Sequence, residues 1–239
     1  MPADPVPSQG AAFDTAPSHV IIVTYGRSGS TLLQNLLNGL EGYCIRGENN
    51  NALFHAARAW HALVGAEPVQ GLRRTGETTG PDHPWYGAET VDTEAFGAAM
   101  ARAFLADVLR PPAGTRVAGF KEIRFHHCGG YLDAYLDFIL RFVPDPRFVF
   151  NTRDHAATAR SGWWAAMDPD AVKRELDIAE ACFARMRERL GERAIAVHYD
   201  DYVADIAALE PLFAFLGDRP DKRTVARVMG RRLPHSGVD

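Results

Sequence analysis

Residues 20–33 constrain the fold more than any other part of the chain. The first five, 20–24, are β-branched and almost wholly apolar, as expected of a strand that is buried on both faces of a parallel sheet. Gly26 and Gly29 then bracket a tight turn, and from Ser30 onward leucines recur at helical spacing. A helix N-terminus that follows a strand and a glycine turn directs free N–H groups and a positive dipole end at one point. The sequence therefore predicts an anion site between a strand and a helix.

The rest of the chain alternates between short apolar strands and longer helical segments. Asp154 is expected to cap one of the helices. Alternating strands and helices predict an α/β fold with three layers, in which helices flank a central, mostly parallel sheet, and ligands bind at the carboxyl ends of its strands. Further strands are expected at 115–123, 147–152 and 194–198, and helices at 30–40, 52–64, 93–110, 130–142, 169–190, 204–216 and 221–229.

Three regions have no predicted regular structure. Residues 41–51 are polar and are expected to form a loop, and 65–91 are rich in Pro and Gly and are expected to form a long functional connection. Residues 1–17 contain four prolines and are expected to form a flexible leader. The remainder, 18–239, is long enough for one sizeable core, so a single domain is predicted.

Composition and charge exclude several kinds of partner and site. The net charge of −4 gives no global basic field for nucleic acid, so an anion site requires a local concentration of Arg and Lys. No apolar run is long enough to span a membrane, and the N-terminus lacks a signal pattern, so a cytoplasmic location is expected. Cys44, Cys128 and Cys182 are widely spaced and odd in number, which disfavours a disulfide framework or a cysteine zinc site.

The residues of the glycine turn indicate which anion it binds. A nucleoside-triphosphate loop, G-x-x-x-x-G-K-[ST], would place a Lys before Ser30, but here the cation is Arg27, inside a shorter turn. The segment instead resembles the 5′-phosphosulfate loop of sulfotransferases that use 3′-phosphoadenosine 5′-phosphosulfate (PAPS), in the R-S-G-[ST]-T-L form of the Golgi, tyrosylprotein and bacterial members. The resemblance implies a P-loop-like fold and a 5′-phosphosulfate site made of Gly26, Arg27, Ser28, Gly29, Ser30 and Thr31.

A second motif begins where the predicted strand 147–152 ends. Arg153 follows the strand, and Ser161, eight positions later, is expected about two turns into the helix capped by Asp154. This pair resembles the sulfotransferase 3′-phosphate motif, although His155 replaces the usual Pro. The resemblance implies that Arg153 and Ser161 bind the 3′-phosphate through a guanidinium fork and a hydroxyl. The alternative is that Arg153 pairs with Asp154 or caps a helix.

Tyr199, at the end of the predicted strand 194–198, resembles a family segment, Y-E-D/E-L-[VL], whose Tyr can lie beside the adenine. A core tyrosine with a satisfied hydroxyl is the alternative. Arg227, Arg231 and Arg232 could reach the 3′-phosphate, but a solvated basic face is the preferred interpretation.

Two carboxylates are candidates for the general base that an attacking hydroxyl requires. Glu48 lies 21 residues after Arg27 in a Gly-Glu context, which resembles the base of tyrosylprotein sulfotransferases. Lys121 resembles a catalytic Lys of the same enzymes, and Lys121-Glu122 also resembles the Lys-Glu pair of heparan-sulfate 3-O-sulfotransferases, in which the Glu is the base. Lys121 and Arg27 are the cations expected to stabilise charge on the leaving oxygen. Strand alternation places Lys121 and Glu122 on opposite faces, which weakens the case for Glu122.

The sequence thus resembles PAPS-dependent sulfotransferases from residue 20 to about 203, and predicts transfer of a sulfuryl group to a hydroxyl, with a carbohydrate as the expected acceptor. An ATP-dependent small-molecule kinase and a non-catalytic nucleotide-binding protein are the alternatives. No metal ligand is predicted, because His126 and His127 lack a further ligand at metal spacing. The acceptor pocket is expected to come from 65–91 and from the loop after Ile123.

Overall fold

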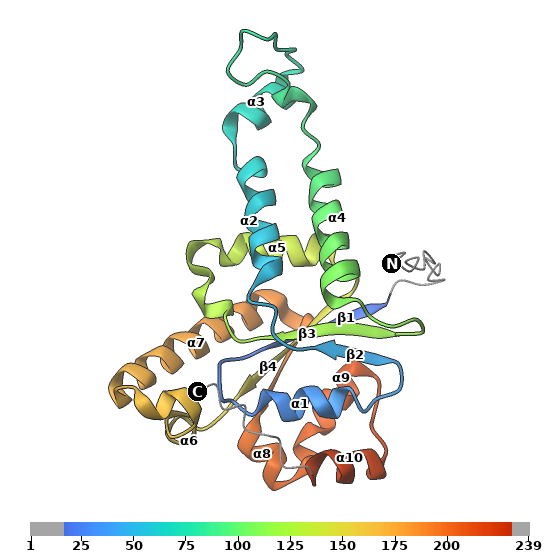
Figure 1. Ribbon diagram of the computed structural model, residues 1–239, viewed down its shortest axis with the longest axis vertical. Helices are drawn as coiled ribbons and strands as arrows, with labels where there is room; N and C mark the ends of the chain where they lie inside the picture. The colour runs from blue at the N-terminus through green and yellow to red at the C-terminus, as the bar shows by residue number, and fades with distance from the viewer. Residues whose placement is uncertain (1–16, 231–239) are drawn as a thin grey trace, which may run out of the picture.

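The computed structural model describes residues 17–230, which form an α/β fold in three layers (Figure 1). One five-stranded sheet has the order β2–β3–β1–β4–β5, and every neighbouring pair is parallel. The predicted fold class is confirmed. Most of the expected leader, with Arg231 and Arg232, lies outside the described residues. The strands are β1 (Ser18–Val23), β2 (Tyr43–Arg46), β3 (Val117–Glu122), β4 (Pro146–Thr152) and β5 (Ala194–His198).

Helices cover both faces of the sheet, and this explains the apolar character of β1. Ile21 and Val23 belong to the core on one face, and Val20 and Ile22 belong to the core on the other. The first face is covered by α2 (Ala52–Val64), α4 (Thr93–Ala103), α5 (Leu132–Phe142) and α7 (Pro169–Leu190). The second is covered by α1 (Ser30–Leu37), α8 (Tyr199–Ala204), α9 (Glu210–Leu216) and α10 (Lys222–Met229).

Shorter helices connect these elements. They are α3 (Glu67–Thr75), α6 (His155–Ala159), the 3-10 helices η1 (Ala88–Thr90), η3 (Phe125–Tyr131), η4 (Gly162–Ala166), η5 (Gly191–Arg193) and η6 (Ile206–Leu209), and a π-helical turn, η2 (Phe104–Leu109). Within residues 17–230, no helix combines the length and the apolar character needed to cross a membrane. All three cysteines are free thiols, as predicted.

A helical excursion, residues 47–116, separates the neighbouring strands β2 and β3. Figure 1 shows α2 and α4 running side by side away from the sheet, with α3 at the far end. Trp60 of α2 packs edge-on against Phe138 and Phe142 of α5, which fixes the base of the excursion. Arg46 donates from Nε to the carbonyl of Leu109 (2.9 Å) and from Nη2 to that of Arg110 (3.0 Å). One side chain therefore ties the start of the excursion to its end.

Two segments expected to lack regular structure contain some. Residues 41–51 include β2, an edge strand in which only Ile45 is buried, so it is too short and too polar to show an alternating pattern. Residues 65–91 include α3 and η1. Pro68 lies in the first turn of α3 and Gly76 ends it in the left-handed conformation (φ 68°). Two of the Pro and Gly residues that suggested a connection, Pro68 and Gly76, therefore start and stop a helix.

Candidate active site

The turn after β1 is held in shape by buried hydrogen bonds to β4. The Thr24 hydroxyl donates to the carbonyl of Asn151 (2.7 Å) and lies 2.6 Å from the Ser28 hydroxyl. The Asn151 side-chain amide donates to the Ser28 carbonyl (3.0 Å) and accepts from the Tyr202 hydroxyl (2.9 Å). All four of these residues are fully buried. Because buried polar groups are costly to leave unpaired, this network fixes the turn without a ligand.

Aromatic rings close on both glycines of the turn. Gly29 has a φ of 76°, and a Cβ there would lie 2.0 Å from the ring of Tyr199. A Cβ on Gly26 would lie 2.2 Å from the ring of Trp163, and the indole N–H of Trp164 donates to the Gly26 carbonyl (2.9 Å). Only glycine fits both positions, so the backbone of the turn lies directly beside Tyr199 and Trp163.

Three side chains predicted to bind phosphate converge at this turn. Arg27, in the left-handed conformation (φ 66°), donates from Nε to the Ser161 hydroxyl (3.1 Å). Arg153 donates from Nη1 to the Arg27 carbonyl (3.1 Å), and its guanidinium lies 4.6 Å from the centre of the Tyr199 ring. The Nε of Arg153 is buried without a hydrogen-bond partner among the described residues, with the nearest Asp200 oxygen 4.0 Å away. Cationic donors and hydroxyls therefore meet at the helix N-terminus.

Ser161 reaches the turn by a different route from the one predicted. Asp154 caps α6 as expected, but α6 ends at Ala159, so Ser161 does not lie two turns into this helix. Gly162, at φ 59°, then redirects the chain into η4. Because the helix stops early, the extended backbone of Ser161 can bring its hydroxyl to Arg27.

Glu48 joins the helical excursion to the sheet. Its carboxylate accepts from Nζ of Lys121 (2.6 Å) and from Nη1 of Arg124 (3.3 Å). The Lys121 side chain is nearly buried, whereas that of Glu48 is 35% exposed. The Glu48 carboxylate is therefore paired with two cations and still accessible to solvent and to a small molecule.

Glu122 has different surroundings, although it is the next residue after Lys121. It is fully buried and accepts from the backbone N–H groups of Asn51 (2.9 Å), Asn49 (3.3 Å) and Ile123 (2.8 Å). Nη1 of Arg124 also donates to it, at 2.8 Å. Four donors occupy this carboxylate, and two of them belong to the loop that carries Glu48.

Residues 17–219 match the model of the sulfotransferase family. The chain belongs to the sulfotransferase family. No curated protein matches it significantly.

Solved sulfotransferase structures share the fold. The sulfotransferase domain from the Synechococcus PCC 7002 olefin synthase is 20% identical over 92% of this chain and 81% of that one, with a TM-score of 0.57. The sulfotransferase domain from the curacin biosynthetic pathway is 15% identical over 89% and 78%, with a TM-score of 0.54. A sulfotransferase from Alicyclobacillus acidocaldarius is 14% identical over 92% and 98%, with a TM-score of 0.50.

The sulfotransferase also has residues in its site that the motifs did not indicate. The Tyr25 hydroxyl accepts from the backbone N–H of Arg153 (2.8 Å) and lies 2.9 Å from the Arg153 carbonyl and 2.8 Å from a Glu180 carboxylate oxygen. Burial raises the pKa of Tyr25 far above its usual value, so the hydroxyl stays neutral. Asn151, a polar residue inside an apolar strand, was the signal in the sequence that could have revealed the buried network.

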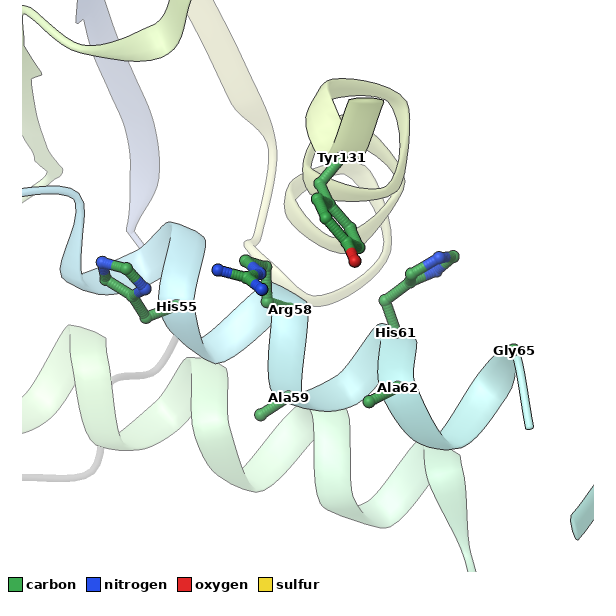
Figure 2. A pocket seen from close by; sticks show the side chains of 7 residues that line it. All are labelled: His55, Arg58, Ala59, His61, Ala62, Gly65 and Tyr131. Carbon is green, nitrogen blue, oxygen red and sulfur yellow. The ribbon is translucent and has the colours of Figure 1, made fainter. Parts of the chain in front are cut away.

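A groove with a volume of about 510 Å³ lies on the excursion side of the sulfotransferase. Figure 2 shows His55, Arg58 and His61 on one side of α2, facing Tyr131 at the end of η3. The Arg58 guanidinium lies 4.7 Å from the centre of the Tyr131 ring. The lining residues are His55, Arg58, Ala59, His61, Ala62, Gly65 and Tyr131. Of the predicted 65–91 pocket, only Gly65 lines this groove, and Tyr131 lies in the predicted helix 130–142, beyond the expected loop after Ile123.

Proposed function

We propose that this sulfotransferase transfers the sulfuryl group of PAPS in line to an acceptor hydroxyl, with Glu48 as the general base. The family generally uses PAPS. The observation that carries the proposal is the meeting of Arg27, Arg153 and Ser161 at one glycine turn. When bound, the cofactor supplies an activated sulfuryl group on a phosphate leaving group.

The residues present fit such a ligand. The backbone of Gly26, Ser28 and Gly29, with the hydroxyls of Ser30 and Thr31, would hold the 5′-phosphosulfate at the N-terminus of α1. The Ser28 hydroxyl is engaged with Thr24, so Ser28 would contribute through its backbone. Arg153 and Ser161 would hold the 3′-phosphate, and the buried Nε of Arg153, which has no hydrogen-bond partner among the described residues, is a donor that an acceptor would satisfy. Tyr199, beside Gly29 and Arg153, would flank the adenine.

Glu48, Arg27 and Lys121 would carry the chemistry. Glu48 removes the proton of the attacking hydroxyl, a contribution worth about 10²- to 10⁴-fold in rate. Arg27 and Lys121 stabilise the negative charge that develops on the leaving oxygen. Glu122 anchors the loop that carries Glu48 instead of acting as the base, because the four donors around its carboxylate leave a substrate no access to it.

We further propose that the acceptor enters by the α2–η3 groove, and that it is a carbohydrate. One wall of the groove, α2, begins four residues after Glu48. The other wall contains Tyr131, which follows Arg124, a partner of Glu48, by seven residues, so both walls begin near the proposed base. Tyr131 offers a ring face, and Arg58 with the two histidines offers polar donors. A flat apolar face with several donors suits a sugar ring.

Calorimetry with 3′,5′-adenosine bisphosphate and with ATP separates a sulfotransferase from a kinase. The proposal predicts tight binding of the bisphosphate and weak binding of ATP, because the kinase-type Lys before Ser30 is missing. The opposite order would overturn it. A transfer screen with ³⁵S-labelled PAPS and sugar, phenol and lipid acceptors distinguishes an enzyme from a nucleotide-binding protein without turnover.

A further inference from the structure

His126 and His127 of η3 lie against Glu175 of α7. The Nε2 atoms of the two histidines are 3.1 Å and 2.6 Å from the same carboxylate oxygen, Oε1 of Glu175. The ligand atoms of the three residues all lie within 4.8 Å of one another. The sequence separates Glu175 from the histidines by 48 residues, so the motif alone could not show that a third ligand is present.

The three side chains differ in exposure in a way that suits a small ion. The side chain of His126 is 4% exposed, that of Glu175 is 33% exposed, and that of His127 is 57% exposed. Tetrahedral zinc with bonds near 2.1 Å places its ligand atoms about 3.4 Å apart. The His126–Glu175 distance is already close to this value, and the exposed His127 can move outward. A fourth position would face solvent, where water can occupy it.

His126 directs one ring nitrogen at the cluster. Nδ1 of His126 is buried without a hydrogen-bond partner among the described residues, so Nε2 makes the polar contact with Glu175.

His155 of α6 provides a contrast, because it lies against the same helix, α7. It lies near two carboxylates of α7, but Nε2 is 3.0 Å from Glu180 and Nδ1 is 3.6 Å from Asp177. Its two nitrogens therefore face different partners, as in an ordinary surface cluster of charges. In the His126–His127–Glu175 cluster, by contrast, two separate rings direct the same atom, Nε2, at one oxygen.

We propose that His126, His127 and Glu175 form a binding site for a divalent transition-metal ion, with Zn²⁺ as the best match to two imidazoles and a carboxylate. Such an ion would tie η3 to α7. Because η3 begins three residues after Glu122, the ion would restrain the chain that leaves β3. The proposal is independent of the cofactor and of the acceptor.

The test is metal binding by the untagged full chain after treatment with a chelator. Calorimetry with ZnCl₂ should give one site, and Co²⁺ should give the visible absorption of a four-coordinate ion. His127→Ala and Glu175→Gln should each weaken binding at least about 10-fold, the lower end of what loss of even an outer-shell partner costs. His155→Ala, the matched control, should leave affinity and stoichiometry unchanged.

Thermal unfolding gives a second readout that does not depend on activity. At a Zn²⁺ concentration about 100 times the Kd, the Tm should rise by about 5–10 °C, and Mg²⁺ should have no such effect. The rise in Tm should disappear in His127→Ala and in His127→Gln. Because the side chain of residue 127 is exposed, these substitutions are not expected to disrupt the fold. Absence of Zn²⁺ and Co²⁺ binding by the wild-type chain, or equal binding by wild type and His127→Ala, would overturn the proposal.

Discussion

The two halves of the candidate site are built in different ways. The proposed cofactor half, made of residues 24–29 with Arg153, Ser161 and Tyr199, follows the carboxyl ends of β1, β4 and β5, and buried hydrogen bonds hold its turn. The proposed acceptor half, made of Glu48, Lys121, Arg124 and the α2–η3 groove, depends on the helical excursion, on the edge strand β2 and on β3. The first half is preorganised by the sheet, whereas the second can vary with the excursion. We expect mutations in the two halves to affect different kinetic constants.

The largest effect on kcat is expected from substitution of Glu48, which tests the acceptor half directly. Glu48→Gln keeps the shape of the side chain and removes its basicity, so kcat should fall by at least about 10²-fold while bisphosphate affinity stays within a few-fold. Rates of ³⁵S transfer and calorimetry measure the two quantities. Glu188→Gln, an exposed carboxylate on α7, is the control and should change neither.

Glu122→Gln tests the rival base. Because it disturbs a buried carboxylate with four donors, it should lower stability by about 1–3 kcal/mol and have a smaller, mixed effect on kcat and KM. A normal kcat in Glu48→Gln together with an inactive, stable Glu122→Gln would exchange the roles of the two residues.

Arg153→Ala should produce the largest loss confined to the cofactor half. Removing a charge-assisted hydrogen bond to a phosphate costs about 1.5–3 kcal/mol, so bisphosphate affinity should fall about 10- to 150-fold. Adenosine 5′-phosphosulfate, which lacks the 3′-phosphate, should bind almost as well as before. Arg160→Ala, an exposed arginine on the same segment, is the control. Equal losses for both ligands would show that Arg153 does not bind the 3′-phosphate.

Arg58→Ala tests whether the acceptor binds in the α2–η3 groove. Loss of one polar contact in an open groove, worth about 0.5–1.5 kcal/mol, should raise the acceptor KM about 2- to 12-fold and leave bisphosphate affinity unchanged. The measurement is KM for the best acceptor of the transfer screen. Arg74→Ala, on α3 at the far end of the excursion, should have no effect. If Arg58→Ala, like the control Arg74→Ala, leaves the acceptor KM unchanged, the acceptor does not bind in this groove.

Tyr199 should give the smallest effect. Tyr199→Ala removes the ring under the Arg153 guanidinium, and a cation–π contact of about 0.5–1 kcal/mol corresponds to a loss of bisphosphate affinity of about 2- to 5-fold. Tyr199→Phe keeps the ring and should bind as the wild type does. A similar loss in both variants would point to the hydroxyl and not to the ring.

The sequence predicted the cofactor half better than the acceptor half, for physical reasons. Residues 20–31 form a strand, a turn and a helix in one local segment, so their spacing alone defines the geometry. The position of Ser161 depended on where α6 ends, which a short helix does not signal strongly. The Glu48–Lys121 pair and the groove arise from contacts between segments 65 or more residues apart, and local pattern does not encode such contacts.

The salt bridge network of Glu48 was also beyond prediction: Glu48, Lys121 and Glu122 were candidates, but Arg124 was not. Strand alternation predicted opposite faces for Lys121 and Glu122, and the structure adds that Arg124 contacts the carboxylates of both Glu48 and Glu122. The edge strand β2 was missed because a four-residue strand with one buried side chain has no measurable period.

The bonds from Arg46 to the carbonyls of Leu109 and Arg110 have a consequence for how such enzymes can diversify. A segment whose two ends are fastened together behaves as a cassette: it can be lengthened, shortened or replaced between its fastened ends without altering the strands on either side. Exchanging residues 47–110 between two family members should therefore carry acceptor preference from one to the other while cofactor affinity stays with the recipient.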